Sequence, residues 1–162
     1  GTRALDSLER YDVFRGRWQS LPPMMERRNA AVGSTIANCL YVCGGHDEGR
    51  TSRTAERYNV VLARWETLTP MMHQRWAAVG VAMGGSLYVI GGDDGRRTLR
   101  SGERYDPKLG HWEALPDMSE GRGGPVCTAI RSHRGCGSSS PSLAGSSQVE
   151  DCIFADVALI AI

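Results

Sequence analysis

The chain has 162 residues, which is about the length of one domain. Its 19 Lys and Arg residues nearly balance its 18 Asp and Glu residues without a long run of one sign, so we expect no nucleic-acid partner. No apolar stretch approaches the roughly 20 residues that cross a bilayer, and the N-terminal GTRALDSLERYD lacks the apolar region of a signal peptide. We therefore expect a cytoplasmic protein that does not enter a membrane.

The five cysteines are odd in number and irregularly spaced, which argues against a disulfide framework. Cys39 and Cys43 fall in one predicted strand, where four residues span roughly 13 Å, too far for a mutual disulfide. The pair also lacks the second pair of ligands that a zinc site requires, so we interpret both as small buried apolar side chains. No metal or cofactor is predicted.

An internal repeat organises the chain. The segment ERYD at 9–12 recurs as ERYN at 56–59 and ERYD at 103–106. A tryptophan follows each tyrosine by seven positions, then come a Leu-x-x-Met segment and an arginine; the arginines are Arg28, Arg75 and Arg122. Every series advances by 47 residues, so no insertion or deletion separates the copies.

Each repeat predicts four short antiparallel strands and no helix. In the second copy the first two strands are expected at about 76–83 and 86–91, joined by the hairpin turn Gly84-Gly85. A polar loop at 93–99 leads to strands at about 101–105 and 111–115, with a turn at 106–110 between them. Four strands in 47 residues form one blade of a β-propeller. The chain holds the last two strands of one blade, two full blades and the first strand of another near 123–130.

The glycine pairs Gly44-Gly45 and Gly91-Gly92 each follow an apolar strand. Neither GxGxxG nor GxxxxGK[ST] occurs, and no helix follows that could offer its N-terminus to a phosphate, so the pairs do not indicate a nucleotide site. We expect them to permit an unusual backbone geometry and the close approach of the next blade. The recurring Tyr and Trp are suited to fill the wedge between blades, which cannot be stable singly.

The pattern LYVIGG...GERYDPKLGHW...LPDM resembles the kelch repeat, over about residues 5 to 130. The resemblance implies an all-β fold, a partial kelch β-propeller of about two and a half four-stranded antiparallel blades. Kelch propellers close with about five to seven blades, so this chain holds part of one.

We assign 1–130 to the kelch repeats. The Ser/Gly-rich segment 131–162 is assigned to a non-propeller tail that is disordered or aberrant, as in a truncated or alternatively spliced product or a partial gene model. Its apolar end is either exposed or a strand that covers the open edge.

No catalytic group is predicted. The four histidines lie at unrelated points of the repeat, and no Ser, Cys or carboxylate is fixed beside them. A copper oxidase is the enzymatic branch of the kelch family, but its Tyr, Cys and His set cannot be assigned to positions of this sequence. We therefore expect a protein without enzymatic activity.

The resemblance implies that a protein partner docks on the loops that join the second strand to the third and the fourth strand to the next blade. Trp76 is the tryptophan that does not recur, and aromatic and arginine side chains dominate interface hot spots. We expect a partner that offers a short acidic peptide. The predicted contacts are Arg27, Arg50, Arg75, Trp76, Arg96 and Arg97.

Two alternatives apply to these arginines. For those that recur in every copy, Arg28, Arg75 and Arg122, the alternative is a structural hydrogen bond between blades, and for the others it is solvated loop charge. The recurring Glu-Arg pairs at 9–10, 56–57 and 103–104 are interpreted as blade-edge salt bridges or solvated positions without a functional role.

Kelch propellers that resemble this chain often follow BTB and BACK domains and recruit substrates to a cullin-3 ubiquitin ligase. No BTB or BACK sequence is present in the 162 residues, so that role rests on the resemblance. Two alternatives are open: binding of actin, the other common partner of the family, and a truncated fragment without a stable fold or a function.

Overall fold

The computed structural model describes residues 3–131 and 157–161, and all regular structure in these ranges is β. Two four-stranded antiparallel sheets form its centre. Blade 1 consists of β3 (Val32–Ile36), β4 (Cys39–Cys43), β7 (Ala55–Asn59) and β8 (Arg64–Leu68). Blade 2 consists of β9 (Val79–Met83), β10 (Ser86–Ile90), β11 (Gly102–Asp106) and β12 (His111–Leu115). The all-β, four-stranded organisation expected from the sequence is confirmed.

Three smaller sheets accompany the two blades. The N-terminal half-blade is the hairpin of β1 (Leu8–Asp12) and β2 (Arg17–Leu21). A short hairpin of β5 (His46–Asp47) and β6 (Arg50–Thr51) extends from blade 1. At the other end, β13 (Cys127–Arg131) pairs antiparallel with β14 (Val157–Ala161). Apart from β14 and Arg131, the segment assigned to the tail lies outside the described residues.

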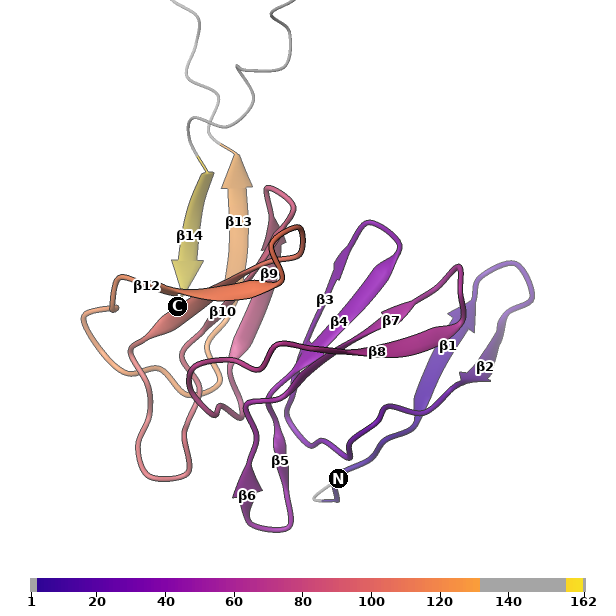
Figure 1. Cartoon of the computed structure of the whole chain (residues 1–162), viewed down its shortest axis with the longest axis horizontal. Helices are drawn as coiled ribbons and strands as arrows, with labels where there is room; N and C mark the ends of the chain where they lie inside the picture. The colour runs from indigo at the N-terminus through magenta and orange to yellow at the C-terminus, as the bar shows by residue number, and fades with distance from the viewer. Residues whose placement is uncertain (1–2, 132–156, 162) are drawn as a thin grey trace, which may run out of the picture.

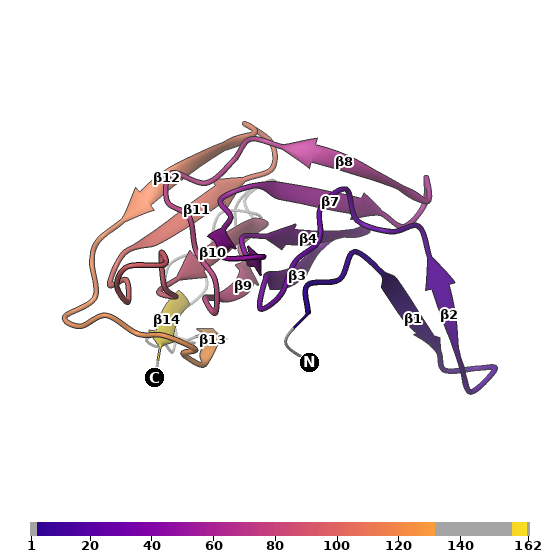
Figure 2. The same ribbon diagram turned by 90° about the horizontal axis from the view of Figure 1, so that it is seen from below.

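The sheets lie side by side in the order of the chain (Figures 1 and 2). In the view of Figure 2, β3 and β9 lie on the inside and β8 and β12 on the outside. β9 packs beside β3, and β13 packs beside β9 in turn, so β13 takes the position of the innermost strand of a further blade.

Blade 1 buries both of its faces because alternate residues of a strand point to opposite sides of a sheet. On β4, Leu40 and Val42 pack toward the N-terminal half-blade in one apolar cluster. Tyr41 and Cys43 instead belong to the larger cluster with blade 2, in which Val89 is fully buried. The core therefore consists of two layers between successive sheets, as the repeat pattern predicted.

Tryptophan side chains join each blade to the one before it. Trp65 of β8 donates its indole N–H to the carbonyl oxygen of Pro22 at 2.8 Å, just after the N-terminal half-blade. Trp112 of β12 donates in the same way to Thr69 at 2.8 Å, just after blade 1. Both side chains are thus packed between sheets, and each buried indole N–H has a hydrogen-bond acceptor.

The glycine pairs serve the contact between blades. Gly44 and Gly45 have φ values of 67° and 98°, a region that side chains disfavour. A Cβ atom on Gly44 would collide with the carbonyl oxygen of Arg75, which accepts the Gly45 N–H at 2.7 Å. The pair thus admits the segment that leads into the next blade, and the interpretation as scaffold is confirmed.

A chain of backbone hydrogen bonds also crosses the blades near the inner strands. The N–H of Ala77 donates to the carbonyl of Ala30 at 2.9 Å, and the N–H of Gly124 donates to the carbonyl of Ala77 at 2.8 Å. Ala30 and Ala77 have positive φ, 50° and 49°. These bonds lie one repeat apart and tie three successive units together.

Several smaller expectations are also settled. Cys39 and Cys43 lie on one strand and are free thiols. The predicted first strand of blade 2 begins later than expected, at Val79, because Trp76 bridges to Asp93 and Ala77 takes the left-handed conformation. Among the described residues, no helix is long and apolar enough to span a bilayer.

Candidate partner-binding face

The loops predicted to bind a partner gather on one side of the molecule. We call this side the loop face; it comprises the second-to-third strand loops 46–51 and 93–98 and the connections 22–31 and 69–78. In Figure 1 the β5–β6 hairpin and the loop between β10 and β11 project from the same edge. This follows from the topology, because in an up-and-down blade these two kinds of connection leave the sheet at one end.

A groove on the loop face brings two of the predicted arginines together. Its volume is about 290 Å³, and it lies between the second-to-third strand loops of blades 1 and 2. We call it the arginine groove; its lining residues are Gly49, Arg50, Thr51, Gln74, Asp94, Gly95 and Arg96. Arg50 and Arg96 are both exposed, and within the described ranges neither guanidinium lies within 4.0 Å of a carboxylate.

Asp94 shapes the groove mainly as a turn former. Its Oδ1 atom accepts the backbone N–H groups of Arg97 at 2.9 Å and Arg96 at 2.8 Å. These hydrogen bonds hold the pKa of the Asp94 carboxyl below its usual value. The carboxylate therefore stays ionised and fixes the loop that presents Arg96 and Arg97.

Arg97 and Arg27, also predicted as contacts, do not line the arginine groove. The side chain of Arg97 is 81% exposed and its Nε lies 3.9 Å from Asp94, an ion pair too open to hold it in place. Arg27 donates to the carbonyl of Ala4 at 3.1 Å and lies 3.8 Å from Glu48. Arg27 is thus partly committed within the chain, whereas Arg97 is available.

Trp76 lies between the two loops that flank the groove. Its side chain is tilted against His46, with 5.8 Å between ring centroids, and its indole N–H donates to Asp93 at 3.4 Å. The residue is 37% exposed. Part of an aromatic side chain is therefore accessible between loops 46–51 and 93–98, and its role in partner binding stays a prediction.

The side chain of Arg75 is not presented on the loop face, although its backbone lies in the connection 69–78, and this corrects the sequence-based prediction. Its side chain is 0% exposed and forms a salt bridge with Glu103 at 3.0 Å. It also donates to the carbonyl of Gly91 and to Ser101 at 2.9 Å each. The hydrogen bonds of its guanidinium group are all made with blade 2 and the loop before β11, so a partner on the loop face cannot reach it.

The buried glutamates were not recognised from the sequence. Glu103 and Glu56, interpreted as edge or solvated residues, are 1% and 2% exposed. Glu56 pairs with Arg28 at 2.9 Å, as Glu103 pairs with Arg75. Each pair joins the connection that enters a blade to the third strand of that same blade, so the structural role proposed as the alternative for these arginines applies at the entry to each blade. The recurrence of a glutamate 28 residues after each arginine could have indicated these pairs from the sequence.

These glutamates also hold the incoming connection. Glu56 accepts the backbone N–H of Met25 at 2.8 Å, and Glu103 accepts that of Met72 at 2.6 Å. Each Arg–Glu pair therefore fixes the base of a loop that contributes to the loop face. In the part of the chain that the structure describes, no group of three or more His, Cys, Asp or Glu residues is placed to hold a metal ion.

Comparison with known proteins agrees with this geometry. A family model for the Kelch motif matches residues 27–72 and 77–119, and each match contains one of the two four-stranded sheets. No curated protein sequence matches the chain significantly. The two matches together cover more than half of the chain. The chain therefore belongs to the kelch repeat family, and its blades form a protein-interaction module.

Proposed function

We propose that the loop face binds an acidic segment of a protein partner, with Arg50, Arg96 and Arg97 as the charged contacts and Trp76 as the apolar one. The observation that carries the proposal is the arginine groove, where Arg50 and Arg96 converge from two blades without a carboxylate partner among the described residues. Arg27 should contribute less to binding, because two of its N–H donors already bind the carbonyl of Ala4.

The chemistry of the groove suits carboxylates. A guanidinium group presents its N–H donors in a planar fork that matches a carboxylate, and such charge-assisted pairs are stronger than neutral hydrogen bonds. Asp94 is the one acidic residue that lines the groove, and its Oδ1 is engaged by the backbone. The two blades fix the backbones from which Arg50 and Arg96 extend, so the ordering required of the module when an acidic segment binds falls mainly on the side chains.

Binding of a labelled Glu/Asp-rich peptide, measured by fluorescence anisotropy, tests the proposal. The double variant Arg50→Ala/Arg96→Ala should weaken binding by about tenfold or more, since hot-spot arginines contribute at least about 1.4 kcal/mol. The matched control is Arg17→Ala/Arg64→Ala, which removes the same charge from exposed positions on outer strands. Equal losses in both double variants would show a general charge effect and would reject the groove as the site.

We further propose that this recognition selects substrates for a cullin-3 ubiquitin ligase and that the module has no enzymatic activity of its own. Membership of the kelch family supports the proposal, with the substrate held on the loop face and the ligase held by other domains. A parent protein should then co-precipitate with cullin-3, and Arg50→Ala/Arg96→Ala should lose the substrate but keep cullin-3. Loss of both, or pelleting of the chain with actin filaments, would argue against the adaptor role.

A further inference from the structure

We propose that the acidic segment bound in the arginine groove carries a phosphorylated serine or threonine, and that Thr51 helps the groove to select the phosphate. The inference rests on the proposed function and defines the class of partner more narrowly. It starts from the Thr51 hydroxyl, a donor in the lining of the groove that binding of carboxylates by the two arginines does not require.

The hydroxyl of Thr51 differs from the other hydroxyls near it in the chain. The side-chain oxygens of Ser52 and Thr54 lie 2.8 Å apart, and Thr54 donates to the carboxylate of Glu26 at 2.6 Å. Thr51 is half-buried, yet its hydroxyl has no hydrogen-bond partner among the residues that the structure describes. Its O–H is therefore free to donate to a bound ligand.

The Thr51 side chain is directed toward the loop 93–98 on the other wall of the groove. A Cβ atom added to Gly95 would lie 3.1 Å from the Thr51 Oγ1, which is closer than an ordinary van der Waals contact. Gly95 also has a φ of 90°, a conformation that side chains disfavour. The glycine thus lets the loop turn and leaves the hydroxyl uncovered.

The donors of the groove suit a phosphate better than a carboxylate. A phosphate monoester carries roughly −1.5 to −2 charges at neutral pH and has three acceptor oxygens on one phosphorus atom. These oxygens can accept from Arg50, Arg96 and Thr51 at the same time. A carboxylate has one charge and two oxygens, and the planar fork of a single guanidinium already satisfies both. A phosphate is therefore the group that uses all three side chains.

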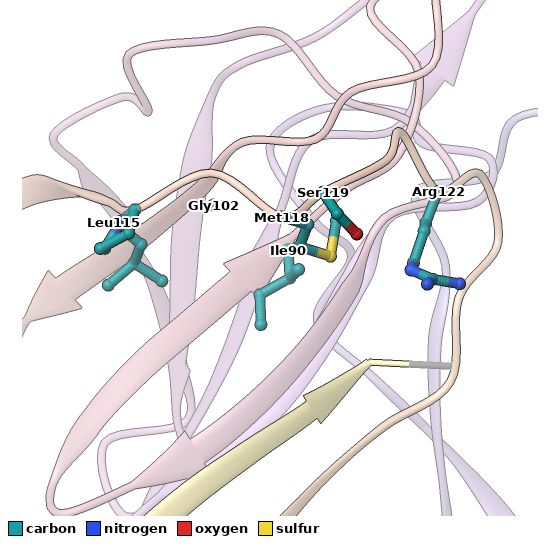
Figure 3. A pocket seen from close by; sticks show the side chains of 7 residues that line it. Ile90, Gly102, Leu115, Met118, Ser119 and Arg122 are labelled. Carbon is teal, nitrogen blue, oxygen red and sulfur yellow. The ribbon is translucent and has the colours of Figure 1, made fainter.

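Another pocket with an arginine and a hydroxyl lacks this arrangement. It lies on blade 2 and has a volume of about 440 Å³. Figure 3 shows its Arg122 and Ser119 together with the apolar side chains of Ile90, Leu115 and Met118. Its described lining contains a single guanidinium group, which balances only part of the charge of a phosphate. The arginine groove, with guanidinium groups from two blades, is thus the better phosphate site.

Fluorescence anisotropy with three labelled peptides tests the proposal. The peptides share one Glu/Asp-rich sequence and differ at one place, which holds phosphoserine, serine or a pair of glutamates with about the charge of the phosphate. The wild-type chain should bind the phosphopeptide about tenfold more tightly than the diglutamate peptide, and the serine peptide most weakly. Thr51→Val should lower the affinity for the phosphopeptide about fivefold, because it removes a hydrogen bond to a charged group, and should leave the affinity for the diglutamate peptide unchanged.

The matched control is Thr98→Val. Thr98 stands 47 residues after Thr51, at the same position of the repeat, and is exposed outside the lining of the arginine groove. This variant should bind all three peptides as the wild-type chain does. An equal loss of phosphopeptide binding in Thr98→Val and Thr51→Val would contradict the role of Thr51 as the selecting residue.

The outcomes separate this inference from the function on which it rests. Equal affinity of the wild-type chain for the phosphopeptide and the diglutamate peptide would overturn the preference for phosphate and keep the binding of acidic segments. No binding of any peptide would reject both. A Thr51→Val chain that circular dichroism shows to be folded, and that binds the phosphopeptide as tightly as the wild-type chain, would also overturn the proposal.

Discussion

The hairpins β1–β2 and β11–β12 each contain a cross-strand Tyr–Trp pair, but the two pairs differ in burial. In both, a tyrosine faces a tryptophan across the strands, with ring centroids 5.4 Å apart for Tyr11–Trp18 and 5.0 Å for Tyr105–Trp112. The first pair is largely exposed and the second is buried. The aromatic pairing is therefore a local property of the hairpin, whereas burial comes from the preceding blade.

This difference separates two levels of stability in the fold. Cross-strand aromatic pairs contribute roughly 0.2–1 kcal/mol within a sheet. Burial of an aromatic side chain between sheets removes a far larger apolar area from water and contributes several times more. The strands of a blade are thus aligned by their own residues but stabilised mainly by their neighbours, as in other repeat proteins.

The largest effect should come from Trp112→Ala. Removal of this side chain leaves a cavity between blades 1 and 2 and should lower the free energy of unfolding by about 4 kcal/mol. Trp18→Ala should change it by less than about 0.5 kcal/mol in the monomer. Urea unfolding at low concentration measures both, and equal losses would contradict the assignment of burial to the preceding blade.

The buried ion pair should give the next largest effect. Glu103→Ala leaves Arg75 charged and unpaired in blade 2 and frees the N–H of Met72, so unfolding should become easier by about 3 kcal/mol. The counterpart Glu9 in the N-terminal half-blade is exposed, so Glu9→Ala should leave the urea midpoint unchanged. If both variants shift the midpoint equally, the pair does not anchor the blade.

A smaller change isolates the hydrogen bond between blades. Trp112→Phe keeps most of the apolar volume but removes the N–H that binds the carbonyl of Thr69, at a cost of about 1 kcal/mol. Trp18→Phe removes an N–H that has no hydrogen-bond partner among residues 3–131 and 157–161 and should be neutral by the same unfolding measurement. A neutral Trp112→Phe would show that packing alone joins the blades.

The smallest effect is a dependence on pH. Burial between blades 1 and 2 raises the pKa of the Cys43 thiol to about 12, above the roughly 8.5 of a free thiol. Above pH 8 the unfolded chain releases this proton and the folded chain keeps it, so stability should fall as pH rises, by about 0.7 kcal/mol between pH 8 and 9.

Cys43→Ala serves as the control for that dependence. It should make the decline smaller without abolishing it, because burial also raises the pKa of other groups, Cys127 among them. The unfolding free energy at pH 8 and pH 9 decides the matter, and an unchanged slope in Cys43→Ala would mean that Cys43 is reached by solvent in the native state.

The sequence predicted most of the fold because the information is repeated. Three aligned copies placed the glycine pairs, the Tyr–Trp pairs and the second, third and fourth strands of blade 2 close to their observed positions. The β5–β6 hairpin was missed, although Glu48-Gly49 is a turn sequence with φ of 45° and 83°. A two-residue strand gives no alternation pattern to detect.

The candidate site was harder to predict because charge alone does not reveal burial. Arg75 and Arg96 were both predicted as contacts, although only Arg75 recurs in every copy, and Arg75 is enclosed by Glu103, Ser101 and Gly91 whereas Arg96 is exposed. Glu103 stands next to Arg104, and adjacent opposite charges suggest a surface pair, but neighbours on a strand face opposite sides of the sheet. Only the long-range pairing with Arg75 shows that Glu103 is internal.

The backbone bonds from Ala77 to Ala30 and from Gly124 to Ala77 have a consequence for amide hydrogen exchange. Their donors lie outside every strand pairing within a blade, so these two amides are protected only while neighbouring blades are docked. Amides inside β4 or β10 stay protected until the blade itself opens. Exchange at Ala77 and Gly124 therefore measures the separation of blades, and exchange within the strands measures their unfolding, in one experiment.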